Sequence, residues 1–305
     1  MEVLINPRGM GAEFDAAFLT RCFSTGWTEA MCRWYLRRDF GGERPDRLLL
    51  MDDQRAVAGG GLAYRLLRTP DNSVHRVSVV VAACTAPGER GRGCYARLLQ
   101  AAIARSASRG CTALLGFVTA DNATGRGLLR QGATAIPSTY IACAAIPGAA
   151  GAAALRVRAT RITDSWPERA GARLRCPPGE AGFQYPDLSS WRSQMVERPH
   201  AIQPLCVGGG RAIIELAGDT DRLQWLDAVA TERQALIASL SLHARRRGRK
   251  FFMYSTRPED AAAAGRLGLE VRPGFMMALA TERRHEILVR GWAALPWNVQ
   301  SGDRL

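Results

Sequence analysis

A short stretch rich in glycine and arginine, residues 83–95, carries the residue types best suited to chemistry in this chain. It reads Ala83-Cys84-Thr85-Ala86-Pro87-Gly88-Glu89-Arg90-Gly91-Arg92-Gly93-Cys94-Tyr95. A β-branched run precedes it and a helical pattern follows, so the stretch is expected to join a strand to a helix. Glycines let the backbone approach a ligand, and the first N–H groups of a helix lack partners within it. With arginines to contact phosphate oxygens, Arg97 among them, the stretch predicts a pyrophosphate site.

The spacing within this stretch separates the known kinds of phosphate loop. The Gly-Lys-Ser/Thr of a nucleoside triphosphate loop does not occur in the sequence. The residues Gly91-x-Gly93-x-x-Ala96 match the glycine pattern of the dinucleotide fingerprint. That fingerprint also requires an acidic residue about 20 positions further along the chain, and the first one here, Asp121, comes a little later than that. A dinucleotide therefore stays an alternative, as does a tight surface turn without a ligand.

The stretch resembles the acetyl-CoA loop of the GNAT acyltransferases, whose pattern is Arg/Gln-x-x-Gly-x-Gly/Ala after a strand. Residues 90–93 fit the variant in which Arg-Gly-x-Gly opens the helix, and residues 85–87 are similar to the family's Thr-x-Pro. Tyr95 departs from the small residue that ends the family pattern. The resemblance implies that acyl-CoA is the co-substrate. The residues it implies as contacts are Ala83, Cys84, Thr85, Arg90, Gly91, Arg92, Gly93, Cys94, Tyr95, Asp121 and Asn122.

The elements expected around the loop follow the order of the GNAT fold, an α/β (α+β) fold with a mixed sheet. Before the loop we expect helices at 14–23 and 28–40 and strands at 47–51, 56–66 and 75–84. After it we expect a helix ending at Gly110, a strand at 112–118, a helix ending at Gly132 and a strand at 136–143. Asp121-Asn122 is expected to cap the second of these helices, and it resembles the family's helix start beside the pantetheine.

A linker of small residues at 146–151 is the best domain boundary, which gives domains at 1–146 and 154–305 joined by 147–153. Beyond it the closing pattern returns as a helix at 231–247, a strand at 251–256, a helix at 258–265 and a strand at 271–280. We therefore predict two tandem GNAT-like domains. The stretch before the second copy's helix carries Asp219, Asp221 and Asp227 without paired glycines and arginines. The second copy is expected to bind no CoA and to have a structural or substrate-shaping role.

Proton transfer is harder to assign than cofactor binding. The GNAT family often places a tyrosine seven positions after the helix-start Asn, but here that position holds Leu129, or Leu128 when counted from Asp121. Tyr95, Tyr64 and Tyr140 are the candidate acids, and each could equally be an ordinary packed aromatic.

Two further residues are candidates for catalysis. His75 begins the strand that leads into the loop and could act as a base, although a lone His at a strand start is often a surface residue. Asp303 lies in a polar tail, residues 297–303, which is expected to reach the first domain's site, because Trp297 and Asp303 would be unusual in a disordered end.

The sequence as a whole predicts an N-acyltransferase, most simply an N-acetyltransferase, that acts on an amine of a small molecule. The alternative is a non-catalytic acyl-CoA-binding or regulatory module. The net charge is +13 and the isoelectric point about 10.1, but the basic residues form no stripe interleaved with aromatics, so nucleic acid is an unlikely partner. The eight cysteines show no metal spacing, and neither a signal peptide nor a membrane span is predicted, so the cytoplasm is expected. The oligomeric state is left open, a dimer included.

Overall fold

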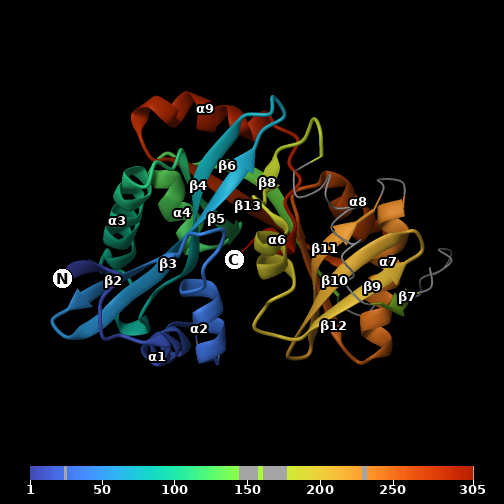
Figure 1. Cartoon of the computed structure of the whole chain (residues 1–305), viewed down its shortest axis with the longest axis horizontal. Coiled ribbons are helices and arrows are strands. Elements are labelled where there is room, and N and C mark those ends of the chain that lie inside the picture. Colours follow the sequence, from blue (N-terminus) through green and yellow to red (C-terminus); the bar gives the residue numbers. More distant parts are fainter. Residues whose placement is uncertain (24–25, 144–156, 161–176, 229–231, 305) are drawn as a thin grey trace.

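The computed structural model describes residues 1–23, 26–143, 157–160, 177–228 and 232–304. Their strands form one mixed sheet that runs through both halves of the molecule (Figure 1). The first half comprises β1 (Glu2–Ile5), α1 (Ala12–Phe23), α2 (Glu29–Leu36), β2 (Asp46–Asp52), β3 (Arg55–Arg68), β4 (Val74–Thr85), α3 (Cys94–Ser108), β5 (Ala113–Thr119), α4 (Ala123–Arg130) and β6 (Thr134–Ala142). The second comprises β7 (Val157–Ala159), β8 (Gly182–Gln184), α6 (Leu188–Met195), β9 (Ile202–Val207), β10 (Gly210–Ala217), β11 (Thr220–Asp227), α7 (Arg233–Arg246), β12 (Lys250–Ser255), α8 (Pro258–Arg266), β13 (Glu270–Ala280) and α9 (Glu286–Gly291).

The first half places helices on both faces of its strands, because successive side chains of a strand point to opposite faces. On β2, Leu49 packs with α1 and α2, whereas its neighbour Leu48 packs with α3 and α4. Every element expected between residues 14 and 143 is present in the structure. The helix expected at 28–40 is shorter, because α2 ends at Leu36 and Phe40 instead pairs with Glu43 in an isolated β-bridge.

The second half repeats the closing pattern of the first. β4, α3, β5, α4 and β6 correspond in order to β11, α7, β12, α8 and β13. β4 pairs with β5 in parallel, and β11 pairs with β12 in parallel. The predicted internal repeat is therefore confirmed as a repeat of element order.

The two halves share strands at their junction. β13, the last strand of the second half, lies between β5 and β6 of the first half, and β6 in turn lies between β13 and β12. Each half thus supplies the strand that completes the other. The expected linker at 147–153 lies outside the described residues, and the sheet is continuous across the proposed domain boundary.

The C-terminal tail, residues 297–304, is part of the interior rather than a loose end. It lies between the two halves, where the C label marks it in Figure 1. Trp297 is 6% exposed and Val299 is fully buried, and both belong to a core that contains residues of β4, β5, β6 and β13. The tail therefore helps to hold the halves together.

Candidate active site

The glycine and arginine loop connects β4 to α3, as predicted. Gly91 and Gly93 have φ values of 81° and 75°, a left-handed conformation that residues with a side chain rarely adopt. Gly93 is the N-cap of α3 and provides no side-chain hydrogen bond, so the first amides of the helix point out of the loop without a side-chain cap. This geometry places partial positive charge where a pyrophosphate would bind.

One arginine of the loop, Arg92, is held by a buried acidic residue. Glu89 is 5% exposed and forms ion pairs with Arg55 and Arg92. Arg90 donates a hydrogen bond to the Cys22 carbonyl oxygen at 3.1 Å, which fixes the loop against the end of α1. Arg92 and Arg97 are exposed at the mouth of the loop. Glu89 therefore orients Arg92.

A β-bulge distorts β4 just before the loop. Gly59 pairs with Cys84 and Gly61 with Val81, so Ala82 and Ala83 together face the single residue Gly60. Ala82 has a φ of 49°, which is unusual for a residue with a side chain. A Cβ at Gly60 would lie 2.9 Å from the Ala83 Cα atom, so glycine is required there.

β4 and β5 diverge just before this bulge. They pair only at Val77–Val79 with Ala113–Leu115, whereas β5 continues to Thr119 and β4 to Thr85. The unpaired ends form a wedge-shaped opening between parallel strands, which we call the first cleft. The backbone groups of β4 that face the cleft have no partner on β5, and they can accept or donate hydrogen bonds to an extended ligand.

The far wall of the cleft is the start of α4. Asn122 caps this helix as predicted, its side-chain oxygen accepting from the Thr124 amide at 2.7 Å. Asp121 accepts from the Thr119 hydroxyl at 2.6 Å, and this bond lowers the pKa of the exposed Asp121 carboxyl. Both residues thus lie at the end of β5, where the GNAT resemblance places them.

Tyr95 lies between α3 and α4, beside the first cleft. A Cβ at Gly127 on α4 would lie 3.3 Å from the Tyr95 ring, and Tyr95 also lines an apolar recess between the bulge and α3 that includes Gly60 and Ala83. Burial raises the pKa of Tyr95 to about 12, so its hydroxyl stays protonated at neutral pH. Its position and protonation keep Tyr95 as the candidate acid.

The other two candidate tyrosines have structural partners. Tyr64 donates a hydrogen bond to the buried Asp46 at 2.6 Å, on the side of the sheet that α3 covers. Tyr140 is on β6, and its ring packs against Tyr254 with a centroid distance of 5.2 Å. At the position where the family often has tyrosine, Leu128 is buried and Leu129 is 52% exposed.

His75 is not near the first cleft, which corrects its assignment as a candidate base. It is the second residue of β4, which ends at Thr85, so roughly 30 Å of extended chain separates His75 from the loop. Its ring lies 5.6 Å from Trp292, and burial lowers the pKa of the imidazole. His75 is a packing residue at the opposite end of the strand.

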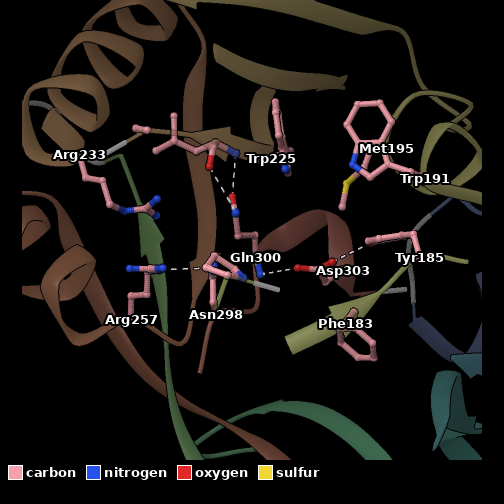
Figure 2. Close-up of a pocket in the computed structure, with 13 residues that line it drawn as sticks. Phe183, Tyr185, Trp191, Met195, Trp225, Arg233, Arg257, Asn298, Gln300 and Asp303 are labelled. Carbon is pink, nitrogen blue, oxygen red and sulfur yellow. Dashed lines mark hydrogen bonds between the residues drawn. The ribbon is translucent and has the colours of Figure 1, made fainter. Parts of the chain in front are cut away.

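The second half contains the same divergence of parallel strands, here called the second cleft. β11 and β12 pair only at Thr220–Arg222 with Lys250–Phe252 and then separate. The tail enters this opening. The Gln300 side chain accepts from the Leu226 amide at 2.7 Å and donates to the Leu226 carbonyl at 3.3 Å, as Figure 2 shows. On the other wall, the Ser301 hydroxyl accepts from the Tyr254 amide at 2.7 Å.

The close fit of the tail is clearest at Gly302. A Cβ there would lie 2.6 Å from the Gln224 carbonyl oxygen, so the backbones of the tail and β11 are in direct contact. The second cleft is therefore filled by the chain itself, which the sequence did not predict.

Asp303 is a structural residue, which corrects its assignment as a catalytic one. It is 7% exposed, and its carboxylate accepts hydrogen bonds from the Tyr185 hydroxyl at 2.7 Å and the Gln300 amide at 2.9 Å (Figure 2). Burial raises the pKa of the carboxyl, against the effect of these bonds. The tail reaches the first half through Arg304, whose guanidinium carbon lies 5.8 Å from the Phe117 ring centroid on β5.

The acids expected beside the second long helix are at the wrong end of β11. Asp219 and Asp221 lie at its start, where they form ion pairs with Lys250 and Arg249, so they cannot repel a phosphate at the start of α7. Only Asp227 lies at the end of the strand that leads toward α7. The sequence of that connection, residues 228–232, contains no glycine or arginine and ends in Glu232, the N-cap of α7.

Residues 14–133 match the sequence model of the Acetyltransferase (GNAT) family. The first half is a GNAT-family domain. None of the curated proteins compared with the chain matches it. The GNAT family uses acetyl-CoA, and the fold supports acyl transfer from CoA. No helix in the described part of the chain is long and apolar enough to cross a membrane.

Solved structures extend the GNAT fold to the whole chain. A probable N-acyltransferase from Enterococcus faecalis V583 superposes with a TM-score of 0.62 at 10% identity, over 93% of this chain and 74% of that one. A tandem GNAT protein from the clavulanic acid biosynthesis pathway gives 0.58 at 12% identity, over 92% and 99%. A putative acetyltransferase from Pyrococcus horikoshii gives 0.60 at 10% identity, over 99% and 96%. The predicted tandem GNAT fold is thus confirmed.

Proposed function

We propose that this chain binds one acyl-CoA in the first cleft and transfers the acyl group to an amine of a small molecule. The observation that supports the proposal most strongly is the combination of the bulge in β4, the divergence of β4 from β5 and the uncapped start of α3. Together they offer backbone partners for an extended arm and positive charge for a pyrophosphate. Acetyl-CoA is the simplest donor.

The transfer itself forms a C–N bond as the acceptor nitrogen attacks the thioester carbonyl, and it breaks the C–S bond. Backbone amides at the bulge, around Ala83, would stabilise the charge that develops on the carbonyl oxygen. The leaving thiolate takes a proton, and Tyr95 is the candidate to supply it, because its hydroxyl is protonated at neutral pH and borders the cleft. The nitrogen releases its own proton to solvent in this scheme.

The second candidate function is a non-catalytic acyl-CoA-binding module. Leucine at positions 128 and 129, where the family often has its tyrosine acid, is the observation that favours it. The two readings share the same binding site and differ only in proton transfer.

Incubation with acetyl-CoA and a panel of small amines separates the two functions, with free thiol as the readout. The proposal predicts thiol release that depends on the amine and falls in Tyr95→Phe without loss of CoA affinity by calorimetry. CoA binding without thiol release from any amine would support the binding module instead. Absence of CoA binding would contradict both.

A further inference from the structure

Arg304 is unusual because its charge has aromatic neighbours and no acidic partner in the part of the chain that the structure describes. Its guanidinium carbon lies 4.6 Å from the Tyr254 ring centroid, 4.7 Å from that of Tyr140 and 5.8 Å from that of Phe117. Its Nε atom is buried without a hydrogen-bond partner among those residues. Stacking on rings leaves the edge of a guanidinium free, and that edge binds planar anions through two parallel hydrogen bonds.

The tail holds Arg304 in place through contacts with the second half. The preceding residues are fixed in the second cleft by Gln300 and Ser301, as described above. The Gln194 side chain on α6 donates to the carbonyl oxygens of Gly302 at 2.6 Å and of Arg304 itself at 3.2 Å. The second half thus uses its cleft to position an arginine.

Arg304 lies beside the first cleft, on the face of β5 that α3 and α4 do not cover. α3 and α4 cover the opposite face, where they pack with Leu114 and Val118 of β5. Phe117 lies between those positions in the strand, so its side chain points to the other face, and it packs against the core that holds the tail. Arg304 contacts Phe117 in the part of β5 that has diverged from β4.

The region around the end of the tail carries excess positive charge. Arg65 is 2% exposed, lies among aromatic rings and has no ion pair with a described residue. Its guanidinium lies 3.4 Å from the Asp303 carbonyl oxygen. Arg38 likewise has hydrogen bonds to Ser193 and Gln194 but no ion pair within the described chain. Asp303 supplies one negative charge that acts on Arg65, which leaves the charges of Arg38 and Arg304 in excess and favours binding of a further anion.

We propose that Arg304 recognises an anionic group, a carboxylate or a phosphate, on the amine acceptor. This inference rests on the proposed acyl transfer in the first cleft, and it names the substrate class of that site. In this account the second half no longer serves as a cofactor-binding domain, and its filled cleft positions a specificity residue for the first.

The test compares matched acceptors in the wild type, Arg304→Gln and Arg304→Lys. One pair is an amino acid and its amide, and the other is a phosphorylated amino alcohol and the parent amino alcohol. Wild type is expected to have a higher kcat/KM for the anionic member of one pair than for its neutral member. A preference in the first pair indicates carboxylate recognition, and a preference in the second indicates phosphate recognition. Arg304→Gln should reduce that preference roughly tenfold or more, because a charge-assisted bond is lost. Arg304→Lys should restore part of it. Arg290→Gln, at an exposed site on α9, is the control that should change nothing.

Two readouts keep this test independent of folding and of the proposed function. The melting temperature and the CoA affinity of Arg304→Gln should stay close to wild type, which shows that the fold and the first cleft are intact. A wild type without anionic preference, or an equal loss for charged and neutral acceptors in Arg304→Gln, would overturn the inference while acyl transfer stands. If no amine is acylated, calorimetry measures the binding of the amino acid and of the phosphorylated amine to CoA-loaded protein. The inference requires that Arg304→Gln weakens the binding of one of these two anionic acceptors.

Discussion

The two clefts of this chain show how one scaffold can hold a ligand or a piece of its own chain. In each half, parallel strands separate after three pairs of residues and expose backbone groups. The first cleft ends in a loop with Gly91 and Gly93 in left-handed conformation and arginines around them. The second ends in a connection without glycine, and residues 299–303 fill it with hydrogen bonds to both walls. The strands create the opening, and the loop chemistry decides its occupant.

The largest effect is expected from breaking the tail's anchor. Trp297→Ala should lower the free energy of unfolding by about 3–5 kcal/mol, because it removes a large buried ring and the hydrogen bond from its indole to the Trp292 carbonyl. Chemical denaturation measures this. Ile287→Ala, at a position 86% exposed, should change stability by less than about 0.5 kcal/mol. A similarly small loss in Trp297→Ala would mean that the tail is only loosely attached.

The buried carboxylate of Asp46 lies behind α3, and its contribution to stability is expected to depend on pH. Asp46 fixes α3 through Arg105 and is also bonded to Tyr64. Burial alone would raise the pKa of Asp46, but these hydrogen bonds outweigh it and hold the pKa below its usual range. The stabilisation is therefore present above about pH 4 and is lost as the pH falls toward the folded-state pKa.

Asp46→Asn should accordingly cost about 2 kcal/mol at pH 7, and the difference from wild type should shrink as the pH falls below 4. Melting curves between pH 7 and pH 2 check this. Asp53→Asn, in an exposed turn, is the control. A difference that stays constant across this range would show that the charge of Asp46 does not stabilise α3.

Two glycines test whether each cleft depends on close backbone contact. Gly302→Ala should destabilise the fold by about 1–3 kcal/mol, because the new Cβ meets the β11 backbone. Gly60→Ala should instead disturb the bulge and weaken CoA binding, because its Cβ meets Ala83. Thermal melting and CoA calorimetry on both variants provide the comparison. Equal CoA affinity in wild type and in folded Gly60→Ala would rule out a role for the bulge.

The smallest effect on stability is expected at the exposed loop arginines, whose substitution acts on CoA binding instead. Arg90→Ala with Arg92→Ala should weaken CoA binding roughly tenfold or more, because each charge-assisted contact to phosphate is worth ~1.5–3 kcal/mol. The double variant Arg283→Ala with Arg284→Ala, on the exposed turn before α9, serves as the matched control. Unchanged CoA affinity in the folded loop variant would remove the phosphate role.

Local patterns in the sequence predicted much of this structure. Apolar periodicity and turn residues located the elements of the first half, and the order of elements revealed the repeat. The exchange of β6 and β13 could not be predicted, because a buried strand's pattern specifies its faces and not its partner. Asp221 was wrongly placed in the connection before the second long helix, because its charge suggests a loop. In the structure it lies within β11, where Arg249 neutralises it. The tail has no apolar periodicity that would predict an element. Its position depends on the second cleft, whose walls β11 and β12 lie far from the tail in the sequence.

The most direct test is the structure of the chain with CoA, combined with the binding stoichiometry from calorimetry. We predict one CoA per chain, with its pyrophosphate at the start of α3, its arm between β4 and β5, and residues 299–303 still between β11 and β12. Two CoA molecules of similar affinity, or one bound in the second cleft with the tail displaced, would contradict it.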